Sequence, residues 1–121
     1  MSDFDQIAAQ YIAVWNETDA VKRRQAIDTL WAADGRYVDP MAAASGRDEI
    51  DATIGAVQQQ FAGLTFRLVG AVDAHHDQAR FQWELGPDGV EAPIVGFDVV
   101  EANSDGQLTQ VLGFLDKVPA A

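Results

Sequence analysis

The chain has 121 residues, of which 48% are apolar, and its formal net charge is −11. This length suits one domain with a single core, and the apolar share argues against a disordered chain. The negative charge disfavours nucleic acids and anionic membrane surfaces as partners, because their phosphates would be repelled. The chain has no cysteine, which excludes disulfides, thiol nucleophiles and cysteine-ligated metals.

The first ten residues, "MSDFDQIAAQ", have no basic segment followed by a continuous apolar run. The sequence therefore predicts neither a signal peptide nor a membrane span. We expect a cytoplasmic protein that forms one domain over residues 1–121.

Two helices are predicted in the first third of the chain. Apolar residues recur at helical spacing over residues 4–15, and Ser2 or Asp3 can cap this helix. After "NETD", Ile27, Leu30 and Trp31 share one face of a second helix. A glycine, Gly35, is placed as the C-terminal stop of that helix.

The segment "RYVDP" is predicted to be a short strand, because Pro40 cannot continue a paired ladder. Alternation along this strand puts Tyr37 and Asp39 on the same face. A third helix is expected to open at Ser45 or Gly46, with an inward apolar stripe that ends at Phe61.

Four strands are predicted over residues 65–74, 78–85, 92–102 and 107–118, separated by the turn signals "HHD", "GPDG" and "NSDG". The order α-α-β-α-β-β-β-β indicates an α+β fold. We expect a curved antiparallel sheet that forms a cone, with three N-terminal helices packed on its concave face. A pocket between the helices and that face is where function should be sought.

Three polar residues stand among apolar neighbours: Tyr11, Asp39 and Asp98. A carboxylate on an apolar face is costly unless it is hydrogen-bonded or takes up a proton, so the position of Asp98 predicts a raised pKa. Each residue also has a structural interpretation. Tyr11 could be a core aromatic and Asp39 a turn residue, while Asp98 could lie on the outer sheet face under a partner subunit.

The register of the last hairpin decides the face of Asp98. If Ala102 pairs with Gln107, Asp98 shares a face with Val111 and Gly113. A slip of one residue would place Asp98 beside Leu112 and Phe114 instead.

The segments "YIAVWNETD", "LWAADGRYVDP" and "SGRDEI", followed by "PIVGFDVVEANSDGQL", resemble the nuclear transport factor 2-like superfamily. The resemblance runs nearly end to end and is closest to the branch of ketosteroid isomerase and the SnoaL-like polyketide cyclases. The pair Trp15 and Asn16 is typical of the SnoaL-like members.

The resemblance to ketosteroid isomerase implies a role for each of the three polar residues. In that family a first-helix tyrosine donates to the substrate oxyanion, and Tyr11 in "QYIAVWN" matches it. The general base is the aspartate of a strand-ending Asp-Pro, which Asp39 matches. A second, protonated aspartate lies eight residues before a hairpin glycine, as Asp98 lies before Gly106.

The resemblance thus implies a cofactor-independent enzyme that transfers a proton next to a carbonyl of an apolar small molecule, such as a steroid, terpenoid or polyketide. A homodimer formed through the sheet is also expected. Seven residues are predicted to line the pocket, although each could instead belong to the core: Trp15, Trp31, Tyr37, Met41, Ile54, Phe61 and Trp83.

Two other functions remain open. The pocket could serve a non-catalytic binding domain. It could also support hydrolysis of the limonene epoxide hydrolase type, which needs an arginine between two acids, and Arg80 has no evident acid partners there. His75 and His76 are adjacent at a turn, so they are interpreted as a solvated hairpin tip rather than metal ligands.

Overall fold

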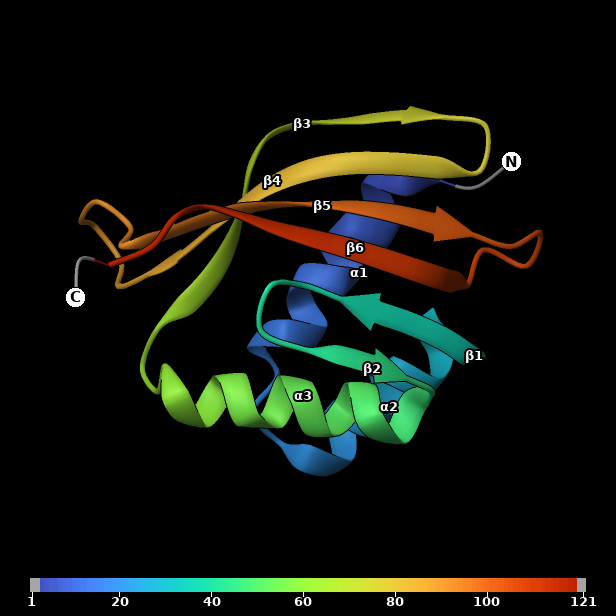
Figure 1. Cartoon of the computed structure of the whole chain (residues 1–121), viewed down its shortest axis with the longest axis horizontal. Coiled ribbons are helices and arrows are strands. Elements are labelled where there is room, and N and C mark those ends of the chain that lie inside the picture. Colours follow the sequence, from blue (N-terminus) through green and yellow to red (C-terminus); the bar gives the residue numbers. More distant parts are fainter. Residues whose placement is uncertain (1–2, 120–121) are drawn as a thin grey trace.

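The structure is a computed structural model that describes residues 3–119, and it contains three helices and a six-stranded sheet (Figure 1). The helices are α1 (Phe4–Asn16), α2 (Ala20–Leu30) and α3 (Arg47–Gln60). The strands are β1 (Trp31–Val38), β2 (Ala43–Ser45), β3 (Thr65–His75), β4 (Gln78–Gly86), β5 (Ile94–Ala102) and β6 (Leu108–Lys117).

The first two helices begin at aspartate caps. The Asp3 side chain accepts a hydrogen bond from the backbone N–H of Gln6, which confirms one of the two predicted caps of α1, while Ser2 lies outside the described residues. The Asp19 side chain accepts from the backbone N–H groups of Val21 and Lys22 at the start of α2. These carboxylates satisfy backbone donors that have no partner within the helix.

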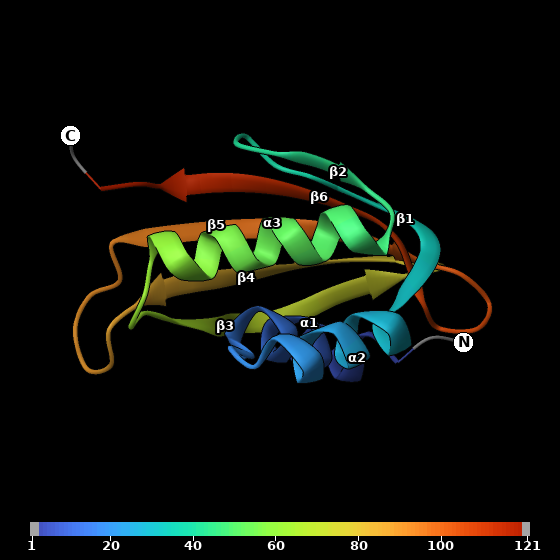
Figure 2. The same ribbon diagram turned by 90° about the horizontal axis from the view of Figure 1, so that it is seen from below.

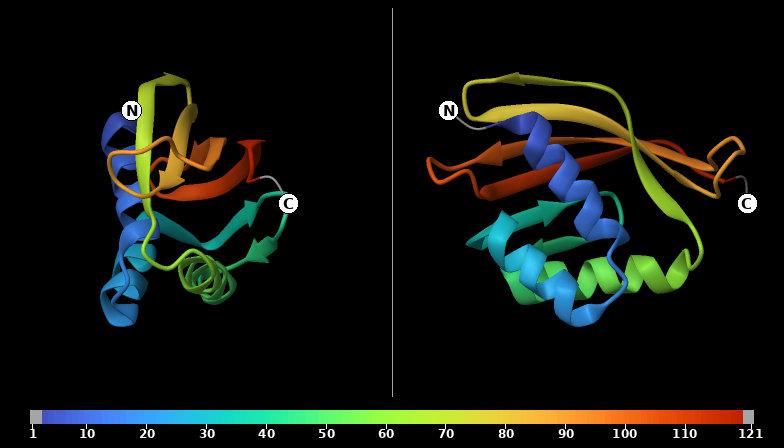
Figure 3. Two further views of the ribbon diagram at one scale, coloured as in Figure 1. Left: turned by 90° about the vertical axis from the view of Figure 1, so that its left-hand side faces the viewer. Right: turned by 180° about the vertical axis from the view of Figure 1, so that it is seen from behind.

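The strands are ordered β2-β1-β6-β5-β4-β3 in a curved sheet that does not close. Figures 2 and 3 show the three helices gathered on one side of this sheet. Helix α1 packs against β3, while α2 and α3 contact β1. The predicted α+β fold is confirmed, with one difference: β1 runs parallel to β6, so the sheet is mixed rather than wholly antiparallel.

The second helix ends earlier than predicted, at Leu30, and Trp31 already begins β1 by pairing with Leu108. Gly35 is therefore not the stop of a helix. Its role is close packing, since a Cβ atom at Gly35 would lie 2.7 Å from Cε3 of Trp31. The fully buried Trp31 ring crosses the strand at this point, and only glycine leaves it room.

The third helix begins at Arg47 after Gly46, as expected, but a short strand precedes it. In this strand Ala44 pairs with Tyr37 of β1 and is buried. Alanine has little preference for strands, so here the pairing with β1 overrides local propensity.

The inner face of the last hairpin carries Asp98. Asp98 pairs with Gly113 and Val100 pairs with Val111, so Asp98 shares a buried face with Val111 and Gly113. The predicted inward placement is confirmed, and the alternative on the outer sheet face is excluded.

The turn of the same hairpin is paired differently from the register considered above. Ala102 pairs with Leu108 rather than Gln107, and the register shifts between Glu101 and Ala102. Such a bulge adds one residue to a strand without moving the rest of its side chains to the other face.

Among residues 3–119, no helix is both long enough and apolar enough to span a membrane.

Candidate functional site

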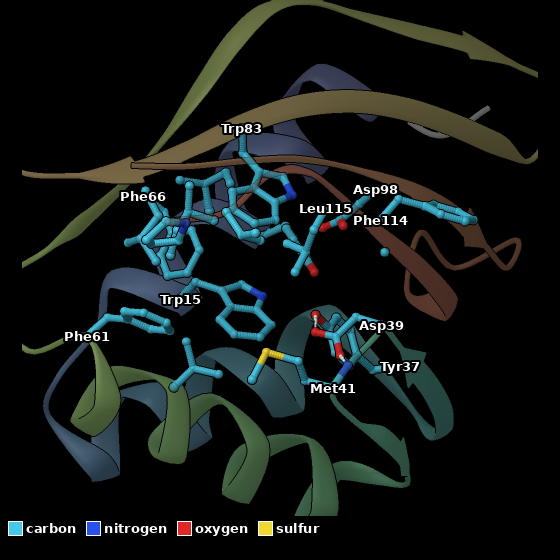
Figure 4. A pocket seen from close by; sticks show the side chains of 18 residues that line it. Trp15, Tyr37, Asp39, Met41, Phe61, Phe66, Trp83, Asp98, Phe114 and Leu115 are labelled. Carbon is cyan, nitrogen blue, oxygen red and sulfur yellow. Dashed lines mark hydrogen bonds between the residues drawn. The ribbon is translucent and has the colours of Figure 1, made fainter. Parts of the chain in front are cut away.

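A cavity of about 210 Å³ opens between the helices and the inner face of the sheet. Figure 4 shows Asp39 and Asp98 at one end of it, with the indole rings of Trp15 and Trp83 beside them and the rings of Phe61 and Phe66 farther along. The lining is otherwise mostly aromatic and aliphatic. A concave space of this kind, with a few polar groups that converge, suits a small apolar ligand.

Eight of the predicted site residues line this cavity: Tyr11, Trp15, Tyr37, Asp39, Met41, Phe61, Trp83 and Asp98. The other two, Trp31 and Ile54, do not. They are 0% and 1% exposed and belong to the core between the helices and β1. Trp31 begins β1 instead of continuing the apolar stripe of α2, and Ile54 lies on the stripe of α3, of which only the C-terminal part at Val57 and Phe61 reaches the cavity.

Asp39 follows the end of β1 and is held by three hydrogen bonds. The Tyr37 hydroxyl donates to Oδ2 at 2.5 Å, and the backbone N–H groups of Met41 and Ala42 donate to Oδ1 at 2.8 Å each. Asp39 is therefore both a turn residue and a residue whose side chain lines the cavity, so the two interpretations from the sequence do not exclude each other. An ionised carboxylate has about four acceptor positions, so one at Oδ2 remains for a ligand.

Asp98 lies on β5 and is only 2% exposed. Its Oδ1 atom has no hydrogen-bond partner among the described residues. Burial raises the pKa of Asp98 from 3.8 to about 6; the nearby Tyr11 hydroxyl and Trp83 indole oppose this rise, and the charge of Asp39 adds to it. The raised pKa that the sequence predicts is thus found, with burial as its main cause.

Tyr11 projects from α1 into the same region and is 2% exposed. Its pKa is well above the ordinary value for tyrosine, first because of burial and then because of the charge of Asp98. The Tyr11 hydroxyl and the indole nitrogens of Trp15 and Trp83 have no hydrogen-bond partner within residues 3–119. Three buried donors thus remain available to an oxygen atom in the cavity.

The tyrosine of β1 differs from Tyr11 because its hydroxyl is engaged by Asp39. Burial raises the pKa of Tyr37, and the charge of Asp98 and the hydrogen bond to Asp39 raise it further. Tyr37 therefore stays a neutral donor that fixes the orientation of Asp39.

Several lining residues were not predicted from the sequence, among them Phe66, Gly113 and Leu115. The Phe66 backbone is tied to α1 by the side chain of Asn16, which donates to its carbonyl at 2.9 Å and accepts from its N–H at 2.8 Å. Gly113 and Leu115 lie on β6, and the first of the two registers considered for the last hairpin already placed Gly113 on the face of Asp98.

Within the described part of the chain, no group of three histidine, aspartate or glutamate side chains could hold a metal ion. His75 ends β3 and His76 lies in the following turn, with a φ of 54° and an exposed side chain. This agrees with the predicted solvated hairpin tip.

Comparisons with known proteins identify the family. The model of the SnoaL-like domain matches residues 8–111. A proposed isomerase of the SnoaL-like family from Agrobacterium tumefaciens has 40% sequence identity and a TM-score of 0.88, over 92% of this chain and 95% of that chain.

Two more distant structures share the fold. A protein from Catenulispora acidiphila with a ketosteroid isomerase-like fold, in complex with trimethylamine, has 20% identity and a TM-score of 0.71, over 88% of this chain and 82% of that chain. A proposed SnoaL-like polyketide cyclase from Jannaschia has 16% identity and a TM-score of 0.70, over 93% of this chain and 86% of that chain. No curated protein matches the sequence. The chain belongs to the SnoaL-like family and has the nuclear transport factor 2-like fold.

Proposed function

We propose that the protein is a small-molecule enzyme of the ketosteroid isomerase type, which moves a proton next to a carbonyl group of an apolar substrate. In this proposal Asp39 is the general base, while Tyr11 and Asp98 bind the carbonyl oxygen. One observation carries it: a buried hydroxyl and a buried carboxyl without partners face the same cavity as a held, ionisable carboxylate.

The chemistry follows from these groups. Asp39 removes a proton from the carbon beside the carbonyl, and negative charge develops on the oxygen as the enolate forms. The Tyr11 hydroxyl and the protonated Asp98 carboxyl donate to that oxygen. With a pKa of about 6, Asp98 holds its proton only below about pH 6, so this role predicts faster turnover in weakly acidic solution.

Two outcomes are open to such an enolate. Asp39 can return its proton to another carbon, which gives an isomerisation, or the enolate carbon can attack a second carbonyl, which gives an aldol-type cyclisation. A steroid, terpenoid or polyketide would each offer the apolar body that the aromatic lining favours. The proposed activities of the Agrobacterium and Jannaschia proteins agree with these two reaction types.

A second candidate is a non-catalytic ligand-binding domain that uses the same cavity. The observation in its favour is that Asp39 already accepts three hydrogen bonds, as a turn residue would. Hydrolysis of the epoxide hydrolase type has less support. Arg80 pairs with Asp73 at 3.2 Å, both side chains are more than half exposed, and no arginine of residues 3–119 lines the cavity.

The expected homodimer through the sheet is also part of the proposal. It is supported by an apolar pair on the outer face, where the rings of Phe97 and Phe114 stack at 4.9 Å and Phe114 is 50% exposed. Analytical ultracentrifugation of the protein and of Phe97→Asp would test it, because a charge at this contact should favour the monomer.

The test of catalysis is the substitution Asp39→Asn. Asparagine keeps an oxygen that can accept from the N–H groups of Met41 and Ala42, so the turn should persist, but it has no basic oxygen. Double-bond migration in a panel of unsaturated ketones would be followed for the parent and the variant. We expect turnover to be lost while binding of phenols stays nearly unchanged.

The matched control is Asp34→Asn, which removes the same charge from an exposed position of the same strand. This control should retain full turnover. Activity that survives Asp39→Asn would exclude the proposed base, whereas phenol binding without turnover of any ketone would favour the binding domain.

A further inference from the structure

The cavity contains acidic groups but no basic ones. Asp39 and Asp98 both line it, and no lysine, arginine or histidine within residues 3–119 does so. The other lining side chains are aromatic or aliphatic. Any charge that the two carboxyl groups carry is therefore not neutralised by the protein inside the cavity.

Of the two carboxyl groups, Asp98 is the less favourable one to ionise, because it is buried and has no cation beside it. The groups near it are Tyr11 from α1, Tyr37 from β1, Trp83 from β4 and Asp39 beyond β1, and none of them is a cation. Its Oδ1 atom has no hydrogen-bond partner among residues 3–119, although Asp98 is only 2% exposed. An isolated buried carboxylate is unfavourable, and a bound cation would remove that cost.

Asp39 and Asp98 are also close to one another. A Cβ atom at Gly113 would lie 2.9 Å from Asp98 Oδ1 and 3.2 Å from Asp39 Cβ, so both residues border the space that this glycine leaves open. The charge of Asp39 adds to the rise in the pKa of Asp98, as expected of like charges at short range. A positive group placed between them would be attracted to both.

An aromatic wall adjoins these carboxyl groups. The ring of Trp15 lies 5.4 Å from the ring of Tyr37 and 5.4 Å from that of Phe66, and the Phe66 and Trp83 rings are also 5.4 Å apart. All four rings line the cavity. Aromatic faces attract cations, and the attraction is strongest where water is excluded.

We propose that the cavity binds a hydrophobic ammonium ion, with its cationic nitrogen near Asp39 and Asp98 and its apolar part against the rings of Trp15, Phe66 and Trp83. This binding needs Asp98 ionised and no proton transfer, whereas the catalytic proposal needs Asp98 protonated, so the two are tested under different conditions. A dry cavity of about 150 Å³ admits benzene, and the cavity here is about 210 Å³. A probe with one substituted ring therefore fits inside it, whereas a molecule as large as a steroid would extend through its open side.

The probe is phenyltrimethylammonium, whose charge does not depend on pH, and its neutral counterpart of the same shape is tert-butylbenzene. Affinities would be measured by calorimetry and by the fluorescence of the tryptophans. At pH 8, where Asp98 is ionised, we expect the ammonium ion to bind roughly tenfold or more tightly than the hydrocarbon. At pH 5, where Asp98 is protonated, this preference should shrink several-fold.

Two variants test whether the preference for the ammonium ion arises from the carboxyl groups in the cavity. Asp98→Asn should lower the affinity for the ammonium ion at pH 8 by about tenfold and remove its pH dependence, while changing the affinity for tert-butylbenzene less than about twofold. Asp39→Asn should lower the affinity for the ammonium ion without removing the pH dependence due to Asp98. The control is Asp105→Asn, which removes one charge from the exposed turn after β5 and should change neither affinity.

The proposal would be overturned by equal affinities for the two probes at pH 8, or by the absence of phenyltrimethylammonium binding at millimolar concentration. It would also be overturned by a preference for the ammonium ion that persists in both variants. Thermal unfolding of each variant establishes that it is folded. Because no ketone is present in these experiments, their outcome says nothing about proton transfer, and the two proposals can fail separately.

Discussion

Gly113 lies directly opposite Asp98 in the β5–β6 pair, and a methyl group at Gly113 would stand 2.9 Å from the Oδ1 atom of Asp98. The same methyl group would stand 3.2 Å from Cβ of Asp39. The φ angle of Gly113 is not positive, so an alanine is opposed here by space and not by backbone conformation. Because Gly113 has no side chain, Asp98 and Asp39 can both approach the space beside it.

We therefore expect Gly113→Ala to displace Asp98 or Asp39 and to lower the free energy of unfolding by about 1–3 kcal/mol, as overpacked sites do. Urea unfolding would measure it. The contrasting variant is Gly55→Ala in α3, where the new Cβ would lie 3.3 Å from the guanidinium of Arg23, which is hydrogen-bonded to Asp51 and Gln58. A helix favours alanine over glycine by about 0.5–1 kcal/mol, which offsets this tight contact, so we expect a stability close to that of the parent. A Gly113→Ala protein with parental stability and phenol binding would contradict the packing argument.

The free energy of unfolding should depend on pH because Asp98 titrates at different pH values in the folded and unfolded states. Its pKa rises from 3.8 in the unfolded chain to about 6 in the folded protein. Between these values the folded state holds more of this proton, so the contribution of Asp98 to the free energy of unfolding falls as the pH rises from about 4 to about 6. Above pH 6 the full cost is present, on the order of 2–3 kcal/mol.

The variant Asp98→Asn removes this titration. We expect it to be more stable than the parent at pH 8 and similar to it at pH 4, as measured by denaturant unfolding at both pH values. A stability difference that is the same at the two pH values would show that Asp98 titrates normally.

Substitutions of Tyr11 and Tyr37 distinguish two roles: binding the oxygen atom of a ligand, and orienting the carboxylate of Asp39. Tyr11→Phe should weaken the binding of a phenolate, which mimics an enolate, by roughly 1–3 kcal/mol, because it removes a charge-assisted hydrogen bond. Tyr37→Phe is the matched control, since the Tyr37 hydroxyl already donates to Asp39. It should lower stability more than phenolate affinity. Calorimetric titration of both variants would decide, and equal losses of affinity would argue against a distinct role for Tyr11.

The link between α1 and β3 should matter for both stability and the cavity. The Asn16 side chain makes two hydrogen bonds to the Phe66 backbone, at 2.9 and 2.8 Å. Asn16→Ala would leave this donor and acceptor without partners, and we expect a loss of about 2–4 kcal/mol in the free energy of unfolding. Asn16→Asp retains the acceptor for the Phe66 N–H but faces the Phe66 carbonyl with another oxygen, so it should not restore stability.

Sequence periodicity was sufficient for the features that depend on local structure. The stripe of α1 placed Tyr11 in the interior, and the turn signals "HHD" and "NSDG" marked the start of β4 and the end of β5 correctly. The alternation around Asp98 identified a carboxyl on an apolar face. In each of these cases, neighbours in the sequence are also neighbours in the fold.

Features set by distant segments were missed. Trp31 fitted the stripe of α2, but its pairing with Leu108 draws it into β1. The roles of Gly35 and Gly113 depend on which side chains come close to them in space, and a pattern of residue types does not contain that information. The same is true of Trp31 and Ile54, whose helical spacing predicted burial without distinguishing the core from the cavity.

The parallel pairing of β1 with β6 has a consequence for how the site is assembled. The strand that carries Tyr37 and leads to Asp39 has only the three-residue β2 as a neighbour until Leu108–Lys117 arrives on its other side. During synthesis, β1 leaves the ribosome long before the strand that completes its pairing, and the gap must be closed by a loop of some seventy residues. We therefore expect the two carboxyl groups to come together late in folding, and a chain that ends before β6 should not hold Asp39 and Asp98 in one cavity.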